Sequence, residues 1–159
     1  MTFTGERVIP GEVDADLFNE HWARYLFAQQ LAAGKRVLDV ACGSGYGSAL
    51  LAEVAQQVVG VDIASDAVCY AKERYARPDF VRADCIALPF AEEQFDLLVA
   101  FEIIEHLSDS QTFLEELRRV VKPQGRLLLS TPNKLYYTQD RGEVNPFHER
   151  DPRVGHEIE

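Results

Sequence analysis

A glycine-rich turn between an apolar strand and a helix constrains the fold of this chain most strongly. Val37 to Val40 is an apolar run of strand-like composition, and the glycines of CGSGYG follow it before a helix predicted over 49–54. Such glycines let the backbone take positive φ and let a ligand approach where a Cβ would collide. The first turn of the helix offers unpaired N–H groups to the same ligand. The stretch therefore predicts a ligand-binding turn after a buried parallel strand.

Two details around this turn discriminate between the ligands that such turns bind. A dinucleotide fingerprint requires glycine at the sixth position counted from Gly43, where this chain has Ser48. Asp39 lies within the strand, and a carboxylate there would repel a pyrophosphate but suits a ligand with an ammonium and a sulfonium group. The charges therefore favour S-adenosylmethionine over a nicotinamide dinucleotide. The alternative for Asp39 is a carboxylate that only accepts hydrogen bonds from loop amides.

Size and composition limit the remaining choices. The 159 residues suffice for one domain with a hydrophobic core, and an apolar content of 47% argues against disorder. The net charge of −10 disfavours nucleic acid as a partner. The three cysteines lack metal-ligand spacing, so we expect reduced thiols in a cytoplasmic protein. No apolar run approaches the roughly 20 residues that a membrane span requires.

Helices and strands are expected to alternate along the chain. Residues 1–34 hold an extended arm and a helix over 14–33, interpreted as a lid or, more plainly, as a packing helix. Residues 35–131 form the ligand-binding core, with further strands at 57–62, 79–82, 94–101 and 125–131. Helices are predicted at 65–76 and from Asp109 or Ser110 to 121, and residues 132–159 form a polar tail. This alternation predicts a parallel α/β sheet with helices on both faces.

Two aspartates follow strands at positions where ligands bind in open α/β sheets. Asp62 lies 19 positions after Gly43, close to the roughly 20 at which an acid that binds ribose hydroxyls is expected. The alternative role for Asp62 is a helix cap, although Ser65 or Asp66 can fill it. Asp84 follows the next strand and could accept a hydrogen bond from an adenine amino group, or serve as a simple turn aspartate.

Taken in order, these motifs resemble the class I S-adenosylmethionine-dependent methyltransferases of the broad bacterial methyltransferase-domain group. The resemblance rests on LDVACGSGYG, GVDIA, ADCIALPF, FDLLVAFEIIEHL and LRRVVKPQGRLLLSTPN, and covers roughly residues 2–150. It implies a Rossmann-like sheet of order 3-2-1-4-5. The implied cofactor contacts are Gly43, Ser44 and Gly45 around the methionine portion, Asp62 with Ile63 at the ribose, Asp84 with the Cys85 backbone at the adenine, and Phe101 beside the methyl group.

One departure from this family concerns the carboxyl-terminal end. The family fold continues after the fifth strand with a helix and an antiparallel strand pair, whereas only 28 residues follow Thr131, without strand-like alternation. The antiparallel strands are therefore expected to be missing, and the fifth strand to be an edge. Because soluble proteins usually cover such edges, we expect the tail, a second copy in a homodimer, or a partner chain to cover it.

The chemistry of methyl transfer directs attention to the residues after the fourth strand. The enzyme must align a nucleophile with the C–S bond and, for an oxygen nucleophile, remove a proton. Glu102, Glu105 and His106 are the candidate catalytic groups. Their E-x-x-E-H spacing, with His148 downstream, resembles metal-dependent O-methyltransferases and would place a divalent cation such as Mg²⁺ on these four residues. Acid–base or substrate contact without metal, and local packing, are the alternatives.

The function expected from the sequence is transfer of a methyl group from S-adenosylmethionine to a small-molecule acceptor, at a hydroxyl oxygen. A non-catalytic module that binds S-adenosylmethionine as a regulatory partner is the competing class. A nicotinamide-dependent oxidoreductase is disfavoured by Ser48 and Asp39.

Overall fold

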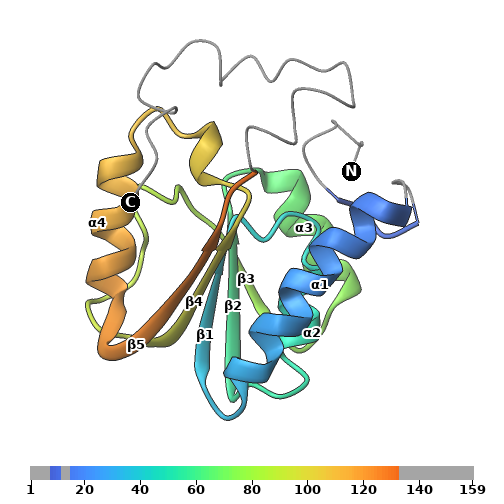
Figure 1. Cartoon of the computed structure of the whole chain (residues 1–159), viewed down its shortest axis with the longest axis horizontal. Coiled ribbons are helices and arrows are strands. Elements are labelled where there is room, and N and C mark those ends of the chain that lie inside the picture. Colours follow the sequence, from blue (N-terminus) through green and yellow to red (C-terminus); the bar gives the residue numbers. More distant parts are fainter. Residues whose placement is uncertain (1–7, 12–14, 133–159) are drawn as a thin grey trace.

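The structure is a computed structural model that describes residues 8–11 and 15–132. Its centre is a five-stranded parallel sheet in the order β3-β2-β1-β4-β5 (Figure 1). The strands are β1 Arg36–Val40, β2 Gln57–Asp62, β3 Asp79–Arg82, β4 Phe95–Phe101 and β5 Val121–Ser130. The helices are α1 Ala15–Ala32, α2 Tyr46–Leu51, α3 Ser65–Arg74 and α4 Ser110–Val120, with a 3₁₀ turn η1 at Ile104–His106. The predicted parallel sheet and its strand order are confirmed.

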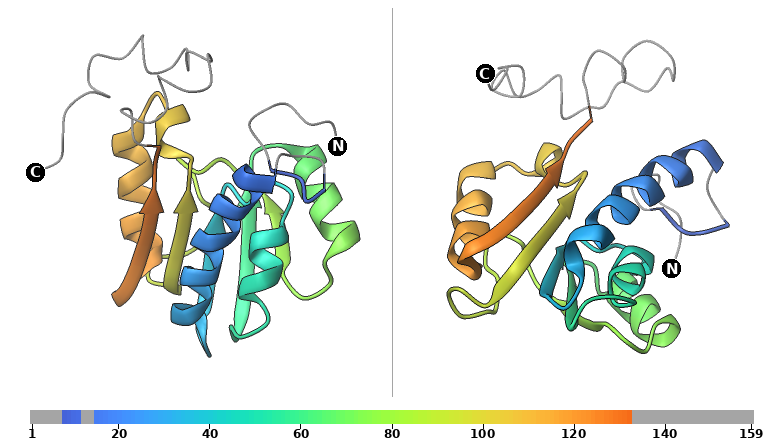
Figure 2. Two further views of the ribbon diagram at one scale, coloured as in Figure 1. Left: turned by 45° about the vertical axis from the view of Figure 1, so that its right-hand side comes forward. Right: turned by 60° about the horizontal axis from the view of Figure 1, so that its bottom comes forward.

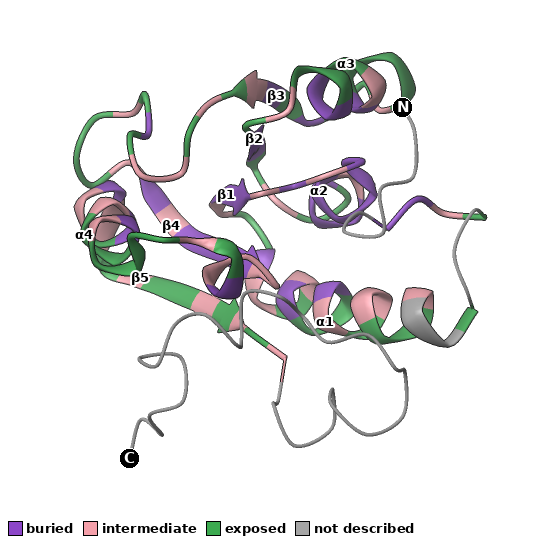
Figure 3. Ribbon diagram, turned by 90° about the horizontal axis from the view of Figure 1, so that it is seen from above, coloured by how far each residue is buried: buried purple, intermediate pink, exposed green. Residues whose placement is uncertain are grey.

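Alternating side chains of the strands bury the two faces of the sheet against different helices, because successive residues of a strand point to opposite faces. On one face Val37, Leu97 and Val99 pack with residues of α1 and α2. On the other face Leu38 and Leu98 pack with apolar residues of α4. Viewed from above, α4 lies on one side of the sheet and α1, α2 and α3 on the other (Figure 3).

Three element boundaries differ from the sequence prediction by three residues or more, and one of them is the end of α2, at Leu51 rather than 54. Helix α2 begins at Tyr46 rather than 49, because Gly45 at φ 83° ends the turn and Gly47 lies within the helix. Strand β5 begins at Val121 rather than 125, where it pairs with Phe95 beside an irregularity in the register. The other helices differ from prediction by one or two residues at their ends.

The β5 edge pairs with β4 alone among the described residues. Leu127 and Leu129 on this strand are 40% and 39% exposed. The expected cover by the tail falls on residues 133–159, which lie outside the described part of the chain. Within the part that the structure describes, no helix combines the length and the apolar character needed to cross a membrane.

All five strands point the same way, so their carboxyl ends meet at one edge of the sheet (Figure 2). Two residues other than glycine take positive φ at this edge: Ala41 after β1, at 59°, and Glu102 after β4, at 54°. Such conformations are strained for residues with a side chain, and they concentrate at functional sites. The edge is therefore the place to look for a ligand pocket.

Candidate functional site

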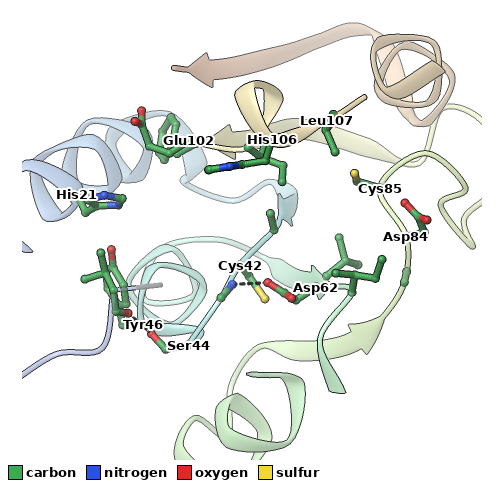
Figure 4. Close-up of a pocket in the computed structure, with 18 of the residues that line it drawn as sticks. His21, Cys42, Ser44, Tyr46, Asp62, Asp84, Cys85, Glu102, His106 and Leu107 are labelled. Carbon is green, nitrogen blue, oxygen red and sulfur yellow. Dashed lines mark hydrogen bonds between the residues drawn. The ribbon is translucent and has the colours of Figure 1, made fainter. Parts of the chain in front are cut away.

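A pocket of about 250 Å³ opens at the carboxyl ends of β1, β2 and β4 (Figure 4). It is bounded by the glycine turn, the segments after β2, β3 and β4, and one face of α1. Nine residues singled out from the sequence line it: Gly43, Ser44, Asp62, Ile63, Asp84, Cys85, Phe101, Glu102 and His106. Asp84 and Cys85 lie at one end of the pocket, and Glu102 and His21 lie towards the other (Figure 4).

Three other candidates do not line this pocket, and a fourth falls outside the described part of the chain. Asp39 is buried on β1, Gly45 ends the glycine turn, and Glu105 follows Glu102 after β4; none of the three belongs to the lining. His148 lies outside the described residues. Most of the residues that the sequence proposed as cofactor contacts therefore line one pocket, but the sequence could not distinguish a lining residue from one that lies outside the lining.

Asp62 shapes the glycine turn directly. One of its carboxylate oxygens accepts a hydrogen bond from the Gly43 backbone N–H at 3.0 Å, and the other accepts from the Ala64 N–H at 2.9 Å. Ser44 donates from its hydroxyl to the carbonyl oxygen of Val8 at 2.7 Å, which ties the N-terminal arm to the turn. Because each oxygen of Asp62 keeps a further lone pair, the carboxylate can still accept ribose hydroxyls.

Asp39 lies fully buried beneath the turn. It accepts hydrogen bonds from the Tyr25 hydroxyl at 3.1 and 3.3 Å and from the Ser48 hydroxyl at 2.6 Å. Burial raises the pKa of Asp39 to about 7, although the two hydroxyl donors act in the opposite direction. Ser48, which breaks the dinucleotide fingerprint, thus serves as a hydrogen-bond donor to the strand aspartate.

Helix α1 supplies pocket residues that the sequence analysis did not single out. His21 and Tyr25 of α1 line the pocket, together with Tyr46 and Val8. The Tyr25 ring packs edge-on against Tyr46 and Phe101, with centroids 5.5 and 5.2 Å apart. The sequence does indicate that these two residues lie together, because His21 and Tyr25 are four residues apart and so share one face of a helix.

The polar end of the pocket is built by the loop after β4. Glu102 accepts a hydrogen bond from the Ser130 hydroxyl at 2.6 Å and lies 3.4 Å from an Arg24 guanidinium nitrogen. Glu105 accepts from the Thr131 hydroxyl at 3.2 Å and lies 3.9 Å from His106 Nε2. Burial raises the pKa of Glu105, and the neighbouring Glu102 charge adds to the rise.

These carboxylates do not form a metal centre within the described part of the chain. No group of three His, Cys, Asp or Glu side chains there is arranged to hold a metal ion. One oxygen of each glutamate that the sequence offered for a cation is engaged by a protein donor: Glu102 Oε1 by Ser130 and Arg24, and Glu105 Oε2 by Thr131. The divalent cation expected from the sequence therefore receives no support from the described residues.

A family model described as a methyltransferase domain matches residues 38–129. The chain belongs to the methyltransferase-domain family. The matched range runs from β1 to β5, so it contains the glycine turn, Asp62 and the loop that carries Glu102.

Relatives of this methyltransferase domain agree with the assignment. The chain is 38% identical over 153 residues to a probable S-adenosylmethionine-dependent methyltransferase of Mycolicibacterium smegmatis, covering 95% of this chain and 60% of that protein. It is 32% identical to a ubiquinone biosynthesis O-methyltransferase of Azorhizobium caulinodans, and the match covers 75% of this chain and 49% of that protein. A Pyrococcus horikoshii protein of known structure superposes with a TM-score of 0.68 at 28% identity, and the superposition covers 80% of this chain and 62% of that protein. The chain thus spans about half to 60% of the length of the curated relatives it matches.

Proposed function

We propose that this chain binds S-adenosylmethionine in the pocket at the carboxyl ends of β1, β2 and β4 and transfers its methyl group to a hydroxyl oxygen of a small-molecule acceptor. The observation that carries the proposal is the arrangement of the glycine turn and Asp62, which line one pocket and are joined by a 3.0 Å hydrogen bond. A ribose bound at Asp62 would place the rest of the nucleoside beside Asp84 and Cys85.

The geometry supports one orientation of the cofactor. The adenine would lie at the Asp84 and Cys85 end, and the methionine portion along Gly43 and Ser44. The sulfonium would then face the opposite end of the pocket, where Glu102 lies. Glu102 is held by Arg24 and Ser130, so its negative charge has a fixed place near the site of the positive sulfur.

Sulfonium chemistry requires little of the protein beyond alignment, proton removal and exclusion of water. Tyr25, Tyr46 and Phe101 supply an apolar wall on one side of the pocket. His106 remains a candidate for contact with the acceptor. Oxygen as the accepting atom draws support from the Azorhizobium caulinodans relative, which is named as an O-methyltransferase.

Isothermal titration followed by a product assay tests this function. We expect S-adenosylmethionine and S-adenosylhomocysteine to bind with one-to-one stoichiometry, and S-adenosylhomocysteine to be released when oxygen acceptors such as catechols or sugars are supplied. Binding of both compounds without turnover of any acceptor would favour the competing class, a regulatory module that only binds the cofactor. Absence of binding would refute the proposal.

A further inference from the structure

One face of α1 carries three functional side chains at helical spacing. His21, Arg24 and Tyr25 stand at positions i, i+3 and i+4, so their side chains lie side by side on the same face of the helix. Each reaches a different part of the site. Tyr25 bonds to Asp39 on β1, Arg24 pairs with Glu102 after β4, and His21 lines the pocket.

The contacts of Tyr25 and Arg24 fix the position of His21 on the helix relative to the pocket. The Tyr25 hydroxyl holds the helix to β1 at 3.1 Å, and the Arg24 guanidinium holds it to Glu102 at 3.4 Å. Both anchors lie within one helical turn of His21. The imidazole is therefore presented to the pocket by a helix that is anchored to β1 and to the loop after β4, and such anchoring gives a reacting group the fixed position that it requires.

His21 stands at the end of the pocket where methyl transfer would occur. Figure 4 shows it near Glu102, away from Asp84 and Cys85 at the adenine end. With the cofactor oriented as proposed above, the sulfonium points towards this end.

The surroundings of His21 favour its neutral form. Burial lowers the pKa of the imidazole, and the positive charge of Arg24 lowers it further, while Glu102 and Glu20 act in the opposite direction. A neutral imidazole has a ring nitrogen that can accept a proton, and it does not repel a sulfonium. These are the properties of a general base that works beside a cationic methyl donor.

Glu102 and His106, the other candidate bases in the pocket lining, have protein groups beside them. Glu102 accepts from Ser130 and pairs with Arg24, and His106 Nε2 lies 3.9 Å from Glu105. Glu105 itself is absent from the pocket lining.

We propose that His21 is the general base of the methyl transfer, an inference that rests on the proposed function. Its imidazole takes the proton of the acceptor hydroxyl as the oxygen attacks the methyl carbon. The O–C bond forms while the C–S bond breaks and leaves its electron pair on sulfur. The products are the methylated acceptor, neutral S-adenosylhomocysteine, and a His21 imidazolium that returns its proton to solvent.

Histidine titration by NMR tests this assignment without knowledge of the acceptor. The chain, labelled with ¹³C-histidine, is titrated between pH 5 and 8.5 while saturated with S-adenosylmethionine or with S-adenosylhomocysteine. The two ligands differ by one methyl group and one positive charge. His21→Gln and His106→Gln serve only to assign the resonances. We expect the His21 titration midpoint to be about one pH unit lower in the S-adenosylmethionine complex, because the added charge disfavours the imidazolium.

Four results would overturn the assignment of His21 as the general base. Equal His21 midpoints in the two complexes would place the imidazole away from the sulfonium and overturn the inference. A His21 still protonated at pH 7 in the S-adenosylmethionine complex would overturn it as well, since an imidazolium cannot accept a proton. A midpoint that moves for His106 and not for His21 would assign the base to His106. Calorimetry that detects no binding of either ligand would instead refute the proposed function, and this inference with it.

Discussion

Replacing Gly47 with alanine tests how tightly α1 is joined to the glycine turn. A Cβ at Gly47 would stand 2.1 to 2.4 Å from three ring carbons of Tyr25, whereas carbon atoms pack at roughly 3.5–4.0 Å. The ring would have to move by about 1.5 Å to restore that spacing. It cannot move freely, because Tyr25 is buried, bonds to Asp39 and packs against Tyr46 and Phe101.

The expected cost follows from these contacts. Overpacking costs about 1–3 kcal/mol, and losing the Tyr25–Asp39 hydrogen bond adds about 1 kcal/mol. The alanine returns roughly 0.5–1 kcal/mol in helical propensity. We therefore expect Gly47→Ala to lower the free energy of unfolding by about 2 kcal/mol.

A double-mutant cycle isolates the clash. In a Tyr25→Ala background the new methyl group enters space that the ring has left, so Gly47→Ala should become neutral or stabilising, which gives a coupling energy of about 2 kcal/mol or more. Urea unfolding at pH 7, followed by circular dichroism, measures all four proteins. Tyr70→Ala is the control background, because Tyr70 lies on α3 against Arg74. The reasoning fails if Gly47→Ala costs the same with and without Tyr25.

Three further predictions concern the carboxylates of the site. Asp62→Ala should weaken S-adenosylmethionine binding about 10- to 100-fold in calorimetry, with the circular dichroism spectrum preserved; unchanged affinity would remove the ribose assignment. Burial raises the pKa of Asp39 from 3.8 to about 7, so its contribution to stability is full below pH 3.8 and is lost as the pH rises to 7, because the unfolded chain ionises first. The difference in unfolding free energy between Asp39→Asn and the wild-type protein should therefore shift by about 2 kcal/mol in favour of the variant as the pH rises from 5 to 8. A difference that does not change with pH would contradict a raised pKa for the buried carboxyl. Because Glu102 and Glu105 already hold protein donors, Mn²⁺ should leave the His106 NMR signal sharp in the S-adenosylhomocysteine complex, and selective broadening would restore the metal hypothesis.

The fold was predictable because its signals are local. The runs that form β1, β2 and β4 are mostly apolar and mostly buried, and glycine or proline marks the turns between elements. The predicted start of α2 is wrong because it depends on a contact between residues that are distant in sequence. The run of glycines indicates a loop that includes Gly47, yet the lack of a side chain at Gly47 makes room for the ring of Tyr25, a residue far away in sequence.

The site was predictable only where its residues follow strands. Asp62, Asp84 and Glu102 could be placed because parallel strands bring their carboxyl ends to one edge. Asp39 was expected to meet the ligand directly, but the structure surrounds it with hydroxyl donors from α1 and α2. No local pattern reveals a pairing between a helix and a strand 14 residues apart. The sequence does not mark His21 as a site residue either, because a polar residue on an amphipathic helix usually faces solvent.

Calorimetric comparison of S-adenosylmethionine with NAD⁺ tests most directly what the pocket recognises. Asp62 beside the glycine turn, the hydroxyl of Ser48 in place of a third glycine, and the apolar wall of aromatic rings all favour a cationic nucleoside. We predict saturable heat for S-adenosylmethionine and for its demethylated product, and none for NAD⁺. Saturable binding of NAD⁺, or a pocket closed to every adenosyl compound, would contradict this conclusion.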